Sequence, residues 1–148
     1  MAIDVWSDSI DIARPVTEVT AFAFEPDNDP TWIGGISAAR LETPRPVAIG
    51  SRVRRVASFR GRRIDYVLEV RELTPVRMHM HAVESPFPMV VTYEFEPRGD
   101  RTVARIRVQG EPSGFYRLAG PLIGRQVRTS ITNDLRTLKR IVETPPSG

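Results

Sequence analysis

The chain has 148 residues, of which 41% are hydrophobic and 26% are charged, and this is typical of one globular domain that encloses a core. It contains no cysteine, which excludes disulfides, thiolate metal ligands and a cysteine nucleophile. The formal charge is +3, from 21 basic and 18 acidic residues. Because the basic residues are scattered along the chain, we do not expect nucleic acid to be a partner.

Residues 1–6 lack the basic segment and apolar run of a secretion signal. No stretch of about 18 consecutive apolar residues occurs that could span a bilayer. We therefore expect a cytoplasmic protein without stable membrane insertion.

The first predicted strand covers residues 9–13, where apolar and polar residues alternate. A short helix then follows from Pro15 to about Phe24, because the fixed φ of proline suits the first turn of a helix. Two prolines within residues 25–30 break the backbone. A second short helix is predicted to begin at residues 31–33.

Six further strands are predicted from the same alternation. They cover residues 38–41, 52–59, 63–71, 76–83, 89–96 and 102–109. The connectors around Gly61, Pro75 and Gly99 have the length and composition of hairpin turns, so neighbouring strands should pair antiparallel. Apolar residues gather on one face of each strand, which predicts a sheet with one dry face and one solvated face.

The last third of the chain predicts one long amphipathic helix. Its apolar side carries Val127, Ile131, Leu135, Leu138 and Val142, which recur at intervals of three and four residues. Burial of five aliphatic side chains is worth roughly 8–15 kcal/mol, so this side of the helix must be covered. The dry face of the sheet can cover it, and the chain is therefore assigned to the α+β class.

This order of elements resembles the START/Bet v 1-like (SRPBCC) superfamily, and in particular its polyketide cyclase/dehydrase-like members. Weak local signatures add to the resemblance. They are Ala13-Arg14-Pro15 before the first helix, Trp32 after an Asp-Pro loop, Ile49-Gly50-Ser51 before a strand, and a Leu-x-x-Leu-Lys ending at Lys139. The resemblance covers about residues 5–143, and none of its signatures is catalytic.

The resemblance implies a single domain over residues 1–148 with a helix-grip fold. In this fold a seven-stranded antiparallel sheet wraps around a long C-terminal helix, and two short helices follow the first strand. It also implies a cavity between sheet and helix that accepts a hydrophobic or amphipathic small-molecule ligand. We expect no cofactor.

Inward-facing aromatic and methionine side chains are candidates for the wall of this cavity, because rings offer faces for stacking and thioethers adapt their shape. The candidates for ligand binding are Phe22, Trp32, Val53, Phe59, Tyr66, Met78, Met80, Tyr93, Phe115, Leu118 and Leu122. The alternative is that each of them simply packs in the core.

Arg55 is a further ligand-binding candidate, because it shares a strand face with Val53 and Ala57. A buried guanidinium needs a carboxylate of the protein, or a carboxylate, phenolate or enolate of a ligand. The alternative is a bulge near the sheet edge that turns Arg55 outward.

Asp134 lies seven residues after Val127, and thus within the apolar side of the last helix. In a low-dielectric cavity the pKa of its carboxyl would rise, which suits a general acid or base, or an anchor for a ligand hydroxyl. The alternative is a structural carboxylate that binds a tyrosine, an arginine or a backbone amide. Tyr66 and Tyr93 are further catalytic candidates, since a tyrosine hydroxyl can donate to a substrate carbonyl.

His79 and His81 share one strand face, but two imidazoles without a third ligand make a weak site, and we expect no metal. Arginines within residues 52–63 could serve a protein or polyanion adaptor, or could discourage edge pairing. An exposed edge strand would also allow a homodimer.

The sequence therefore favours binding of a hydrophobic or amphipathic small molecule. The alternative is a polyketide cyclase/dehydratase-type enzyme that uses the same cavity. A protein or polyanion adaptor that acts through the arginine hairpin, Arg52 to Arg63, is a weaker alternative. No motif in the sequence identifies a reaction.

Overall fold

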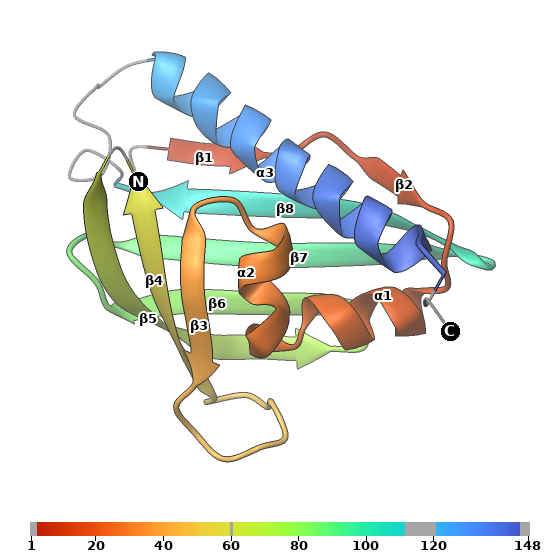
Figure 1. Cartoon of the computed structure of the whole chain (residues 1–148), viewed down its shortest axis with the longest axis horizontal. Coiled ribbons are helices and arrows are strands. Elements are labelled where there is room, and N and C mark those ends of the chain that lie inside the picture. The colour runs from red at the N-terminus through yellow and green to blue at the C-terminus, as the bar shows by residue number, and fades with distance from the viewer. Residues whose placement is uncertain (1–2, 60, 112–120, 146–148) are drawn as a thin grey trace.

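Eight strands form one antiparallel sheet in the computed structural model, which describes residues 3–59, 61–111 and 121–145. The strands are β1 Ile3–Trp6, β2 Ile10–Ile12, β3 Ile36–Leu41, β4 Arg52–Phe59, β5 Arg62–Thr74, β6 Arg77–Glu84, β7 Met89–Arg98 and β8 Arg101–Gly110. Their order is β1-β8-β7-β6-β5-β4-β3, and β2 also pairs with β8 (Figure 1). The sequence of hairpins from β3 to β8 confirms the predicted antiparallel connections.

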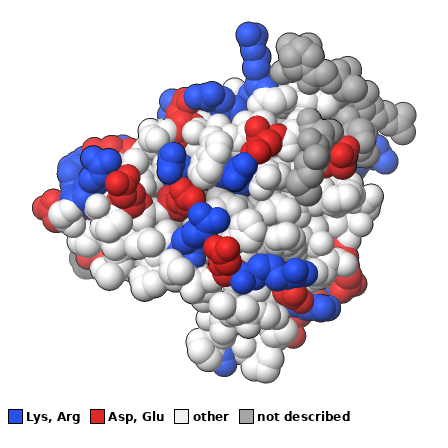
Figure 2. All heavy atoms as spheres, turned by 180° about the vertical axis from the view of Figure 1, so that it is seen from behind, with Lys and Arg blue, Asp and Glu red and all other residues white. Residues whose placement is uncertain are grey.

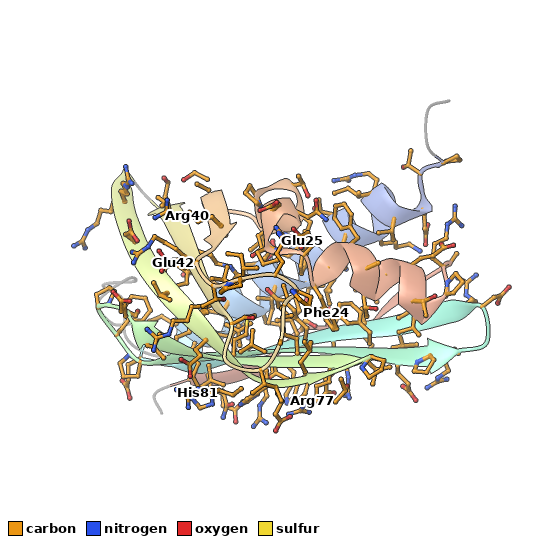
Figure 3. The ribbon with its side chains drawn as sticks, turned by 90° about the horizontal axis from the view of Figure 1, so that it is seen from below. Phe24, Glu25, Arg40, Glu42, Arg77 and His81 are labelled. Atoms are coloured by element: carbon orange, nitrogen blue, oxygen red, sulfur yellow. The ribbon has the colours of Figure 1, made fainter. Side chains whose placement is uncertain are left out.

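The helices lie together on one face of this sheet (Figures 1 and 3). They are α1 Val16–Ala23, the 3₁₀ helix η1 Pro26–Asn28, α2 Asp29–Trp32 and α3 Pro121–Glu143. The long helix α3 crosses the strands obliquely in Figure 1. This arrangement confirms the α+β helix-grip fold.

The strand predicted over residues 9–13 is β2, and the strand β1 that precedes it was not predicted. The backbone N–H of Ser7 donates to the carbonyl of Ile106 at 2.8 Å, and the Ser7 hydroxyl accepts from the N–H of Ile106 at 2.9 Å. Between β1 and β2, the Ser7 hydroxyl thus takes the place of a backbone carbonyl in the hydrogen-bond ladder with β8. Both strands pair with β8, so the sheet keeps the seven positions across its width that the fold requires.

The inner face of the sheet forms the hydrophobic core with the helices. Leu68, Val70 and Phe95 from the strands pack in one cluster with Leu135 and Leu138 of α3. The period of two in the strands and the period near 3.6 in α3 place these residues on facing surfaces. The core is therefore the one that the sequence pattern predicts.

The outer face of the sheet carries paired charges. Figure 2 shows basic and acidic side chains interspersed over this face, and Figure 3 shows Arg77 and His81 directed away from the helices. Arg77 contacts Glu72 at 2.9 Å and Glu94 at 2.6 Å. Such pairs neutralise one another locally and keep the sheet face hydrated.

The same pairing holds for two arginines of the hairpin formed by residues 52–63. Arg52 contacts Glu69 at 3.0 Å, and Arg54 contacts Glu42 at 2.9 Å and Asp65 at 2.6 Å. These two arginines are compensated by carboxylates, which weighs against a polyanion surface at this position. In the described part of the chain β3 lies at one edge of the sheet, and a dimer through that edge stays a prediction.

No helix in the described ranges is both long enough and apolar enough to cross a bilayer.

Candidate ligand pocket

A pocket of about 540 Å³ lies between α3 and the inner face of the sheet. Its wall is formed by Ile3, Ile33, Gly34, Gly35, Ile36, Arg55, Ala57, Ser58, Tyr66, Phe87, Met89, Val91, Tyr93, Ile106, Val108, Gln126, Val127, Ser130, Ile131 and Asp134. The size falls within the range of small-molecule sites in proteins. Most of the wall is apolar, and the charged groups that the described part of the chain contributes to it are Arg55 and Asp134.

Arg55 is buried on the inner face, with 4% of its surface exposed. The pairing of β4 with β5 runs without a register shift from Arg52 to Phe59, so the bulge that would have turned Arg55 outward does not occur there. Its Nε donates to Asp29 Oδ2 at 3.0 Å, and its Nη2 donates to the Tyr93 hydroxyl at 2.8 Å. The guanidinium thus has a protein carboxylate as its counterion.

Asp29, the partner of Arg55, was not selected from the sequence. It opens α2 within the segment expected only to break the backbone, and 3% of its surface is exposed. Burial raises the pKa of Asp29, while the positive charge of Arg55 opposes that shift. Burial likewise opposes the charge on Arg55, but Asp29 and the nearby Tyr93 and Tyr66 raise the pKa of Arg55 well above its ordinary value.

The Arg55–Asp29 contact is therefore a buried ion pair. An arginine stays protonated at any physiological pH, so its burial requires a negative partner at hydrogen-bond distance. The pair joins α2 to β4 at one end of the pocket. In the sequence, the signal for Asp29 was an acidic residue within a proline-rich segment. Its contact with Arg55 is visible in the folded chain alone.

Asp134 enters the pocket from α3, and 7% of its surface is exposed. The backbone N–H of Gly34 donates to its Oδ1 at 2.9 Å. Burial raises the pKa of Asp134 to about 6, although the Gly34 hydrogen bond and the charge of Arg55 both lower it. A Cβ on Gly34 would lie 3.3 Å from Asp134 Oδ1, so glycine suits this close approach.

Tyr66 and Tyr93 complete the polar end of the pocket. Tyr66 lies directly opposite Arg55 in the β4–β5 ladder. The ring of Tyr93 packs against Trp32 with centroids 5.5 Å apart. Burial raises the pKa of Tyr93, so its hydroxyl stays protonated near neutral pH.

The structure thus brings together four of the residues selected from the sequence, namely Arg55, Tyr66, Tyr93 and Asp134. Other candidates lie outside the wall. Phe22, Trp32, Val53, Met78 and Met80 do not line the pocket. Trp32, Met78 and Met80 belong to the hydrophobic core, Phe22 packs against it, and Val53 is buried on β4.

Two of the remaining candidates, Phe115 and Leu118, lie outside the described residues, as do the side chains of Phe59 and Leu122. The wall also contains residues that were not singled out. Met89, Val91, Ile106 and Val108 come from β7 and β8, where the strand alternation was a usable signal. The turn from Ile33 to Ile36 carried no such signal, because its place depends on how α2 meets α3.

His79 and His81 lie on the outer face, away from the pocket. Their Nε2 atoms are 3.1 Å apart, and His79 Nδ1 lies 2.7 Å from the Thr92 hydroxyl. Among residues 3–59, 61–111 and 121–145, no three potential metal ligands gather in one place.

The fold occurs in several solved structures of low sequence identity. A START superfamily protein from Mycobacterium smegmatis is 14% identical with a TM-score of 0.78, and the match covers 95% of this chain and 97% of that chain. The Zhui aromatase/cyclase from Streptomyces sp. R1128 is 14% identical with a TM-score of 0.68, over 95% and 93% of the two chains. Major latex-like protein 151 from Panax ginseng is 12% identical with a TM-score of 0.71, over 96% and 98%.

Identities this low establish the shared fold alone. A comparison with curated proteins found no match. The sequence itself matches a family model over residues 5–143, which is nearly its whole length, and that family is described as polyketide cyclase / dehydrase and lipid transport. The chain therefore belongs to the polyketide cyclase/dehydrase and lipid transport family.

Proposed function

We propose that the protein binds a hydrophobic or amphipathic small molecule in the pocket between α3 and the sheet. The observation that carries this proposal is the division of the pocket wall. Apolar residues such as Val91, Ile106 and Ile131 form most of it, and its polar groups are those of Arg55, Asp134 and two tyrosines. Apolar burial would supply affinity, and the polar groups would orient one end of the ligand.

Native mass spectrometry of the purified protein tests this proposal. Retained molecules, extracted and identified, should be small and largely apolar. Ser130 and Thr129 offer a matched pair of variants, because both are exposed on α3 and only Ser130 lines the pocket. Ser130→Trp should weaken binding of a hydrophobic probe at least 10-fold, while Thr129→Trp should leave it unchanged. Equal binding by both variants would place the probe elsewhere.

A cyclase or dehydratase activity is the second candidate, and the position of Asp134 favours it. A carboxyl with a pKa of about 6 can exchange protons near neutral pH, and the Tyr66 and Tyr93 hydroxyls can donate to an oxygen that becomes negative. Asp134→Asn should then abolish turnover of a poly-carbonyl substrate while the substrate still binds. Unchanged turnover in this variant would remove Asp134 from the chemistry.

A further inference from the structure

Among the described residues, the polar end of the pocket has no excess of positive charge, although an arginine lies in its wall. Arg55 is held by Asp29, with Nη2 2.9 Å and Nε 3.0 Å from the same carboxylate oxygen. Glu25 and Asp27 also raise the pKa of Asp29 through their charge, but each of them is itself paired with Arg45, at 2.6 Å and 3.0 Å. Arg55, the one positive group that the described residues contribute to the wall, is therefore balanced before any ligand enters.

Asp134 faces the same space with a second carboxylate. The backbone N–H of Gly34 and the charge of Arg55 act on it directly, and Tyr66 and Tyr93 line the same pocket. When Asp134 is ionised, the formal charges of Arg55, Asp29 and Asp134 add up to one negative charge. A ligand carboxylate would lose its hydration and meet this net negative charge in a low-dielectric pocket.

The hydrogen-bond groups suit a neutral partner. The Tyr93 oxygen accepts from Arg55, and its hydroxyl proton has no acceptor among the described residues. Within the same ranges the Tyr66 hydroxyl has no protein partner either. Two donors are thus available to a carbonyl oxygen, and Asp134 can accept from a ligand hydroxyl.

We propose that this pocket selects ligands whose polar end is a neutral carbonyl or hydroxyl group, and that it rejects ligands of the same shape that end in a carboxylate. The inference rests on the proposed binding function. It assigns Asp29 the role of a specificity residue, which acts by balancing the charge of Arg55 without lining the pocket itself.

A pair of nearly isosteric probes tests the proposal. 2-Acetylnaphthalene and 2-naphthoate share the same rings and differ in a methyl ketone against a carboxylate. Isothermal titration calorimetry at pH 8, where an Asp134 carboxyl with a pKa of about 6 is ionised, should show at least 10-fold tighter binding of the ketone. Equal or tighter binding of the carboxylate would overturn the inference and leave the binding function intact. Failure of both probes to bind would count against the pocket itself.

Two variants test whether charge is the cause of the preference for the ketone. Asp134→Asn removes one negative charge and should reduce the preference for the ketone at least threefold at pH 8. Asp29→Asn leaves the charge of Arg55 unbalanced and should favour 2-naphthoate. If Asp29→Asn does not fold, the wild-type ratio and Asp134→Asn decide the question. A ketone preference that is unchanged in Asp134→Asn would contradict a charge-based origin.

Discussion

At the scale of single residues, Arg55 and Asp29 depend on each other. Both are almost fully buried, and each supplies the charge that makes burial of the other tolerable. Such a pair adds little net stability compared with apolar residues of similar size, but it is costly to break, because one buried charge is then left without a partner.

Asp29→Asn should therefore lower the free energy of unfolding by about 3–5 kcal/mol. Replacing both partners, as in Asp29→Asn with Arg55→Met, should recover much of that loss, since neither charge remains. Urea denaturation of the two variants and the wild type measures the difference. If Asp29→Asn alone were as stable as the wild type, the pair would not be buried as the structure shows.

Asp134 should make stability depend on pH. Its folded pKa of about 6 lies above the unfolded value of 3.8, so the folded protein holds the proton more tightly. The stabilising contribution is complete below the unfolded pKa and is lost as the pH rises through about 6.

Asp134→Asn does not titrate, and an amide oxygen can still accept from the Gly34 N–H. The stability of this variant relative to the wild type should therefore rise by up to about 3 kcal/mol between pH 4 and pH 8. Chemical denaturation across this pH range supplies the comparison. A constant difference would show that Asp134 has an ordinary pKa.

At the scale of elements, α3 is held by its apolar side. Leu135 is fully buried against the sheet, whereas the neighbouring Arg136 is exposed and bonds only to Asn133 of the same helix within the described residues. Leu135→Ala should cost about 2–5 kcal/mol of unfolding free energy, because it removes methyl groups from a packed core. Arg136→Ala should stay within about 0.5 kcal/mol of the wild type. Thermal or urea unfolding distinguishes the two, and similar losses in both would contradict the orientation of α3.

The elements also show how far the sequence could be interpreted. Alternation in β5 to β7 and the spacing of Val127, Ile131 and Leu135 predicted which sides face the core, because local periodicity encodes them directly. Strand β1 was missed, since its place in the sheet depends on pairing with β8, about one hundred residues away in sequence.

The same limit applies to the site. The register of Arg55 and Asp134 with apolar neighbours made them candidates for inward positions, but the sequence left the alternatives open. The partnership of Asp29 with Arg55 was not predicted, because it joins a short helix to a strand through the folded chain. Met78 and Met80 shared the signature of a pocket wall but lie in the core instead, and local pattern does not distinguish these two environments.

At the scale of the whole molecule, one helix and one sheet enclose the pocket from two sides. The helix packs closely at its C-terminal half through Leu135 and Leu138, while Val127 and Ile131 line the open space. The sheet and α3 together thus combine a solid core at one end with a cavity of about 540 Å³ at the other. A ligand present at a concentration 100 times its dissociation constant would add about 2.7 kcal/mol to the free energy of unfolding.

The most direct test of this account is a crystal structure of the protein with 2-acetylnaphthalene. We expect the rings between α3 and the inner face of the sheet, against Val91 and Ile131, with the ketone oxygen at hydrogen-bond distance from a hydroxyl of Tyr66 or Tyr93. A structure in which α3 closes onto the sheet and fills this space, or in which the probe lies only on the outer surface, would contradict the account.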